Sequence, residues 1–82
     1  MDKKSVIEIV QSVGSVGCTG AERYIDYPDE IDGDWVQIVY FDDERGLAVY
    51  LVDTDGYNGE FVDYDDYSHR EEIERYLETL SN

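Results

Sequence analysis

The stretch WVQIVYFDDERGLAVYLV, residues 35–52, decides the fold. Its first seven and last six residues are almost wholly apolar, and the five residues between them, DDERG at 42–46, are polar and end in a glycine. Two apolar runs joined by a loop of this length and composition predict a β-hairpin. Because residues 35–41 are the most apolar part of the chain, we expect them to form the central strand.

Further strands are expected on both sides of this hairpin. The loop at 53–59, DTDGYNG, contains two glycines and an asparagine that tolerate positive φ, so residues 60–64 are expected to return as a third antiparallel strand. Residues 23–27 are aromatic and β-branched enough for a short strand, which Pro28 would end or confine to an edge. We expect residues 15–20 to form a connector and residues 29–34 an acidic loop.

One amphipathic helix is expected near each end of the chain. Val6, Ile9, Val10 and Val13 have helical spacing, with Asp2 or Ser5 available as the N-cap and Gly14 as the stop. Near the other end, Ser68 and Glu71 have the spacing of a capping box, and a second apolar stripe follows. That stripe is Ile73, Tyr76, Leu77 and Leu80.

The predicted fold is therefore a single α+β domain over residues 1–82. It consists of an antiparallel β-meander of three to four strands flanked by an N-terminal and a C-terminal helix, in the order α-(β)-β-β-β-α. A domain this small has a thin core and little room for a deep pocket.

The net charge of -15 is the most unusual property of the sequence. Nucleic acid and anionic membranes would repel such a chain, so they are excluded as direct partners, whereas basic proteins and cations remain. The charge is uneven: residues 1–20 sum to zero, residues 21–34 to -5 and residues 53–66 to -6. An adaptation to high salt, the alternative explanation, would predict an even coat of acid.

A cytoplasmic location is expected from the remaining composition. Cys18 is the only cysteine, so the chain has no internal disulfide. The apolar stretch that follows Lys4 is interrupted by Glu8, and it is too short for a signal peptide or a membrane span.

The predicted contact surface joins acids of the strand ends and loops with interleaved tyrosines, because tyrosine supplies apolar area and a π-face for arginine. Its members are Asp26, Asp29, Glu30, Asp32, Asp34, Asp42, Asp43, Glu44, Asp53, Asp55, Tyr57, Glu60, Asp63, Tyr64, Asp65, Asp66 and Tyr67. Three pairs are spaced i, i+2: Asp32/Asp34, Asp53/Asp55 and Asp63/Asp65. In extended backbone the carboxylates of such a pair would lie on one side, ~6.6 Å apart. The basic partner would be a nucleic-acid-binding effector or a nuclease, bound by a monomer or a homodimer.

Other chemistry finds less support in the sequence. The loop that starts at Asp53 has some features of a calcium site, but Tyr57, Asn58 and Tyr64 occupy positions where ligands or the turn glycine are needed. Cys18 and His69 are too few for a zinc centre, and His69 has no neighbouring nucleophile in the sequence. No cofactor, metal ion or catalytic residue is predicted. Two alternatives stay open: a small enzyme based on carboxylates, and a calcium-binding domain.

In size, charge and element order, and in its acidic, tyrosine-rich hairpins such as residues 53–67, the chain resembles the small acidic inhibitors that phages and mobile elements encode. These include anti-CRISPR proteins and anti-restriction DNA mimics. The resemblance implies that the protein occupies the DNA-binding channel of a nuclease effector, with the PAM-reading site of a CRISPR effector as the expected target. An immunity protein or antitoxin that covers a nuclease toxin is the alternative with the same electrostatics.

Overall fold

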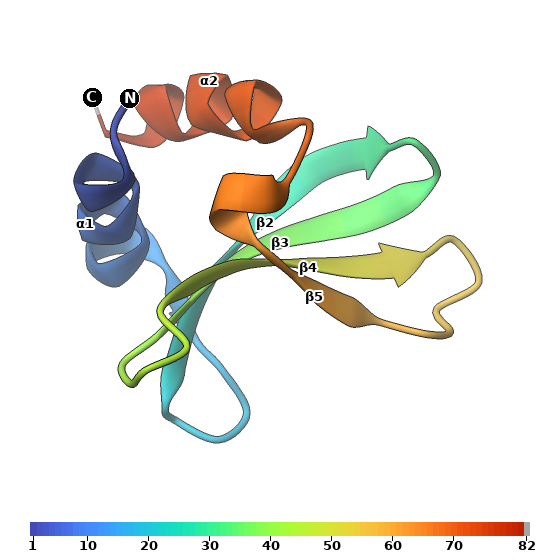
Figure 1. Ribbon diagram of the computed structural model, residues 1–82, viewed down its shortest axis with the longest axis horizontal. Coiled ribbons are helices and arrows are strands. Elements are labelled where there is room, and N and C mark those ends of the chain that lie inside the picture. Colours follow the sequence, from blue (N-terminus) through green and yellow to red (C-terminus); the bar gives the residue numbers. More distant parts are fainter. Residues whose placement is uncertain (82) are drawn as a thin grey trace.

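The computed structural model describes residues 1–81, which form a five-stranded antiparallel sheet with two helices against one of its faces (Figure 1). The elements are α1 (Lys3–Val13), β1 (Ser15–Val16), β2 (Glu22–Ile31), β3 (Asp34–Phe41), β4 (Leu47–Asp53), β5 (Glu60–Asp63), the short 3₁₀ helix η1 (Tyr64–Asp66) and α2 (Arg70–Leu80). The strands follow one another in the order β1-β2-β3-β4-β5. The predicted α+β meander between two helices is confirmed, with one more strand than expected.

The extra strand and the length of β2 differ from the prediction. Residues 15–16, expected in a connector, pair with Arg23 and Tyr24 as β1. The expectation of a loop at 29–34 is wrong, because β2 continues past Pro28 through an irregularity between Asp26 and Glu30 and pairs with β3 up to Ile31. The sequence signal for this pairing is the two-residue turn Asp32-Gly33, whose φ angles of 52° and 83° are both positive, as a type I′ hairpin requires.

The N-terminal helix is capped as its sequence indicates. The backbone N–H of Ser5 donates to Asp2 Oδ1 at 2.8 Å. The interactions of Asp2 with Ser5, first that of the Ser5 side chain and then that of its backbone N–H, lower the pKa of the Asp2 carboxyl. At the other end of α1, a Cβ atom at Gly14 would lie 2.3 Å from the carbonyl oxygen of Val10. Only glycine can therefore stand where the chain leaves α1 for the sheet.

The predicted capping box of α2 is not formed. His69, and not Ser68, is the N-cap residue, and it makes no side-chain capping bond. The helix therefore begins one residue later than the S-x-x-E pattern suggests, and Glu72, in its first turn, lies beside the His69 ring.

The two faces of the sheet are packed differently. The larger core lies between the sheet and the helices and includes Val6, Val10, Ile38, Ile73 and Leu77, all fully buried. A second, small cluster of Val39, Phe41 and Ala48 lies on the opposite face, which we call the open face. No helix lies over that face in the described part of the chain (Figure 1).

Candidate interaction surface

The largest group of acids lies at one end of the sheet, which we call the hairpin end. The β2–β3 turn and the β4–β5 loop both lie there, because alternate connections of an antiparallel meander share an end (Figure 1). Residues 29–34 and 53–60 contribute seven acids and no lysine or arginine. These acids are Asp29, Glu30, Asp32, Asp34, Asp53, Asp55 and Glu60.

Two of these acids face each other directly. Asp34 in β3 and Asp53 in β4 are Cα partners, so their side chains leave neighbouring strands on the same side of the sheet. Both are only partly exposed. Directly opposed like charges destabilise a sheet, so this arrangement works against stability.

Cations of the chain itself do not neutralise the hairpin end. Within residues 1–81, the ion pairs of lysine and arginine join Lys3 and Arg70 to Asp65, and Arg45 to Asp43. In the described part of the chain, the ion pair at this end is with His69, which supplies positive charge when protonated: its Nε2 lies 2.6 Å from Asp32 Oδ2 and its Nδ1 lies 3.1 Å from Glu72 Oε1. These hydrogen bonds, first the one with Glu72, raise the pKa of His69 above its ordinary value.

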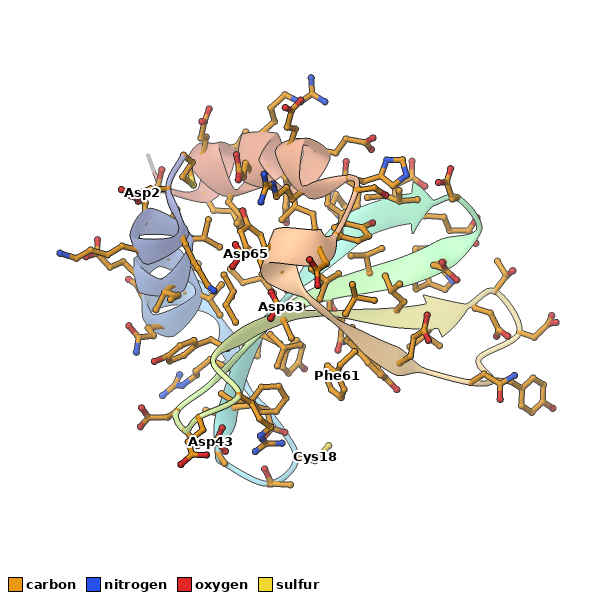
Figure 2. The ribbon with its side chains drawn as sticks, viewed as in Figure 1. Asp2, Cys18, Asp43, Phe61, Asp63 and Asp65 are labelled. Carbon is orange, nitrogen blue, oxygen red and sulfur yellow. The ribbon has the colours of Figure 1, made fainter. Side chains whose placement is uncertain are left out.

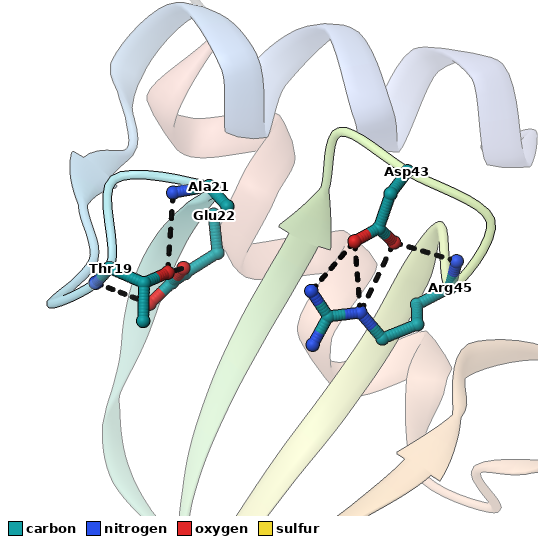
Figure 3. Close-up of polar contacts among 5 residues, drawn as sticks. All are labelled: Thr19, Ala21, Glu22, Asp43 and Arg45. Carbon is teal, nitrogen blue, oxygen red and sulfur yellow. Dashed lines mark hydrogen bonds and ion pairs between the residues drawn. The ribbon is translucent and has the colours of Figure 1, made fainter.

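The remaining predicted acids lie elsewhere. Asp42, Asp43 and Glu44 lie in the β3–β4 loop at the opposite end of the sheet (Figure 2). There the guanidinium of Arg45 donates to Asp43 Oδ2 from Nε at 3.1 Å and from Nη2 at 2.7 Å (Figure 3). These hydrogen bonds lower the pKa of the Asp43 carboxyl. In the neighbouring loop, the Thr19 hydroxyl donates to the Glu22 carboxylate (Figure 3).

The last residue of β5 and the acids of η1 form a third group: Asp63, Asp65 and Asp66. Asp63 Oδ1 accepts from the backbone N–H of Asp65 at 2.9 Å and so caps η1, while Asp65 pairs with Lys3. Figure 2 shows Asp63 and Asp65 beside η1, apart from Asp43. The 17 predicted residues thus form several separate groups and not one surface.

Two of the predicted tyrosines lie in the core. Tyr64 is 2% exposed and its hydroxyl donates to Glu74 Oε1 at 2.6 Å, and Tyr67 is 8% exposed. Burial, followed by the nearby carboxylates of Glu72, Asp32 and Asp34, raises the pKa of Tyr67 to about 12. The expectation that these two rings contact a partner is therefore wrong, whereas Tyr57 is exposed in the β4–β5 loop.

The predicted i, i+2 carboxylate pairs do not form rows along extended backbone. Each pair has one member at a strand end and the other in a turn or in η1: Asp32 and Asp55 lie in turns, and Asp65 lies in η1. The neighbouring carboxylates come instead from pairing across strands, as at Asp34 and Asp53.

The aromatic side chains of the open face were not among the predicted site residues. Trp35 and Phe61 are 47% and 56% exposed, and Tyr24 and Tyr50 are partly exposed beside the small apolar cluster. The period-2 alternation along β3 could have identified this face in the sequence, because alternate residues of a strand point to opposite sides. Val36 and Ile38 face the helices. The residues on the open face are Trp35, Gln37, Val39 and Phe41. Because residues 35–41 are apolar at almost every position, the sequence did not distinguish the two faces of this strand.

Metal and proton chemistry have little support in the side-chain arrangement. Among residues 1–81, no three His, Cys, Asp or Glu side chains converge as metal ligands. In the loop weighed as a calcium site, Asp53 Oδ1 accepts from the backbone N–H of Tyr57 at 2.8 Å. The carboxyls of Asp2, Glu22 and Asp43 have lowered pKa values because of local hydrogen bonds, which makes them weak bases.

Comparisons with protein-family models, with curated proteins and with solved structures found no match to this chain. None of the helices described within residues 1–81 has the length and apolar character needed to cross a membrane.

Proposed function

We propose that this protein is an acidic binding protein whose hairpin end occupies a cationic, nucleic-acid-binding groove of another protein, as a mimic of the nucleic acid. The observation that carries the proposal is the group of seven acids at one end of the sheet with neither lysine nor arginine among the residues of that end. Such an end attracts basic surfaces over a Debye length and repels nucleic acid and other anions.

The opposed carboxylates support the same function. Asp34 and Asp53 are kept face to face at a cost in stability, and sites of function are where such costs are expected. A partner that brings arginine or lysine between them would relieve the repulsion on binding, so part of the binding free energy would come from the strain of the free protein.

A capture experiment with matched variants tests the proposal. The protein is immobilised, proteins from a bacterial lysate are captured at low salt, and the captured protein is challenged with duplex DNA. The variant Asp55→Asn/Glu60→Gln removes two exposed charges from the hairpin end, and Glu8→Gln/Glu71→Gln removes two charges from the exposed faces of the helices. Both variants have the same net charge, so only the location differs.

We expect duplex DNA and added salt to release the captured protein, and the hairpin-end variant alone to show a several-fold lower association rate. A captured protein that DNA fails to displace would refute mimicry of nucleic acid. Equal behaviour of the two variants would show that net charge, and not the hairpin end, governs binding.

A further inference from the structure

The open face carries aromatic rings that no other part of the described chain covers. Trp35 and Phe61 expose about half of their surface, at 47% and 56%. Phe61 packs edge-on against Phe41, with ring centroids 5.4 Å apart, and against Tyr50 at 4.7 Å. The Phe61 ring is therefore held in place by its two neighbours, so it has little conformational entropy left to lose when it binds a partner.

The face is also hollowed. A cavity of about 240 Å³ lies over β2, β3, β4 and β5 and is lined by Tyr24, Val39, Phe41, Tyr50 and Phe61. Its wall is completed by the loop that contains Cys18, which Figure 2 shows below Phe61. Its floor, made by Val39, Phe41 and the aromatic rings around them, is apolar.

Acids surround these rings on the same face. Glu22, Asp26 and Glu30 in β2 are the Cα partners of Phe41, Gln37 and Trp35, so each carboxylate leaves the sheet on the side of the open face. Asp63 in β5 reaches this side as the partner of Ala48. We call these four acids the rim. Gln37 Nε2 donates to Asp26 Oδ1 at 2.6 Å and fixes the direction of one of them.

A guanidinium group already binds in this manner within the protein. The Cζ atom of Arg45 lies 3.9 Å from the centroid of the Phe41 ring while its nitrogens bind Asp43. Stacking on a ring combined with pairing to a carboxylate is the arrangement in which arginine differs from lysine, because only guanidinium has a planar face and a forked set of donors. Trp35 with Glu30 repeats the pair of ring and acid, and no guanidinium of residues 1–81 stacks on it.

Charge decides between the possible occupants. A second copy of this chain would bring another net charge of -15 and a second acidic rim against the first. Single-stranded nucleic acid also stacks on aromatic sheet faces, but it needs a basic groove, and this rim is acidic. An arginine-rich segment can interact with both parts of the face, because guanidinium groups stack on aromatic rings and form ion pairs with carboxylates.

We propose that the open face binds an arginine-rich segment of the partner protein, with guanidinium groups stacked on Trp35 and Phe61 and paired with the rim. This inference rests on the proposed function, since it assigns the partner's chemistry, but it concerns the open face, which shares only Glu30 with the hairpin end. The hairpin end supplies attraction at long range, and the open face supplies selectivity for arginine.

The test compares nona-arginine and nona-lysine peptides as probes of equal charge. Their affinities are measured by calorimetry at low salt for wild-type protein and two variants. Trp35→Leu/Phe61→Leu keeps apolar bulk and removes both exposed π-faces, whereas Trp35→Phe/Phe61→Tyr keeps a ring at each position. We expect wild-type protein to prefer nona-arginine, and the leucine variant to bind nona-arginine about 5- to 30-fold more weakly, as two exposed cation–π contacts require.

The outcomes separate the two proposals. Two results support the inference: the leucine variant binds nona-lysine within about 2-fold of wild type, and the ring-keeping variant loses less affinity for nona-arginine than the leucine variant does. Equal affinity of wild type for both peptides, or no effect of the leucine change, overturns the open face as the arginine site and leaves the hairpin end standing. Binding of neither peptide at low salt contradicts the proposed function itself. Binding of oligothymidylate to the face, or a dimer that the leucine change dissolves, would overturn the choice of occupant.

Discussion

Neutralising Asp34 is expected to stabilise the protein. The carboxylate of Asp34 faces that of Asp53 across β3 and β4. Within residues 1–81 the Asp34 side chain makes no hydrogen bond or ion pair, so Asp34→Asn removes a repulsion without breaking a polar contact. The asparagine keeps the shape of the side chain, which leaves the packing around it unchanged.

The size of the effect follows from the geometry of the pair. A directly opposed like-charge pair in an antiparallel sheet destabilises it by about 0.2–1 kcal/mol. For a domain of this length, each 1 kcal/mol shifts the melting temperature by about 4–8 °C, so Asp34→Asn should raise Tm by about 1–8 °C. The gain should shrink in about 1 M salt, where the Debye length is about 3 Å.

Thermal unfolding followed by circular dichroism, at low and at high salt, measures this shift. Asp55→Asn is the matched control, because Asp55 is an exposed residue of the β4–β5 loop with no cross-strand partner. We expect Asp55→Asn to raise Tm by less than Asp34→Asn. A Tm that is unchanged or lower in Asp34→Asn at low salt would show that the two carboxylates do not repel each other, and it would remove one support of the proposed function.

Three further predictions concern separate features. Because the bonds of His69 to Glu72 and Asp32 raise its pKa, its stabilising contribution is fully present below the ordinary pKa of 6.5 and is lost as pH rises through the raised pKa. The difference in unfolding free energy between wild type and His69→Gln should therefore be larger at pH 6 than at pH 9, and a difference that grows with pH would show that the two carboxylates do not stabilise the protonated ring. Trp35 is the only tryptophan and has Glu30 as its cross-strand partner, so at low salt its quenching by caesium, relative to that of N-acetyltryptophanamide, should exceed its relative quenching by iodide, and the two relative values should converge as salt is added; a larger relative value for iodide would contradict an acidic rim. Tyr64→Phe deletes a hydrogen bond from a buried hydroxyl to a carboxylate and should lower the unfolding free energy by about 1–3 kcal/mol in urea titrations, whereas an unchanged midpoint would show that η1 is not tied to α2 through this bond.

The order of elements could be predicted because local patterns agree with the final packing. The runs at 35–41 and 47–52, the loop at 42–46 and the spacing of Val6 and Val10 all have one physically consistent interpretation. The extent of β2 could not be predicted in the same way, because Pro28 and a run of acids both disfavour a strand. Pairing with β3 overrides those preferences, and the Asp32-Gly33 turn fixes the register.

The candidate surface was only partly predictable. The excess of acid and its concentration in the segments 21–34 and 53–66 are properties of composition, and on electrostatic grounds alone they indicate a basic partner. Which acids share an end depends on strand pairing, so the opposition of Asp34 and Asp53 and the separation of Asp43 emerge only from the fold. Tyr64 and Tyr67 could not be distinguished from surface tyrosines, because amphipathic rings occur in both places.

The length of β2 has a consequence for self-association. Its first residues pair with β1, but from Ile25 to Ile31 its outer edge has no neighbouring strand among residues 1–81, and such an edge is a template for intermolecular sheet growth. Pro28 removes one donor from that edge, and Asp26, Asp29 and Glu30 place negative charge along it. The isoelectric point of the sequence is about 4.1, and near that pH the net charge that keeps two such edges apart is lost. Acidification should therefore promote ordered aggregation along this strand.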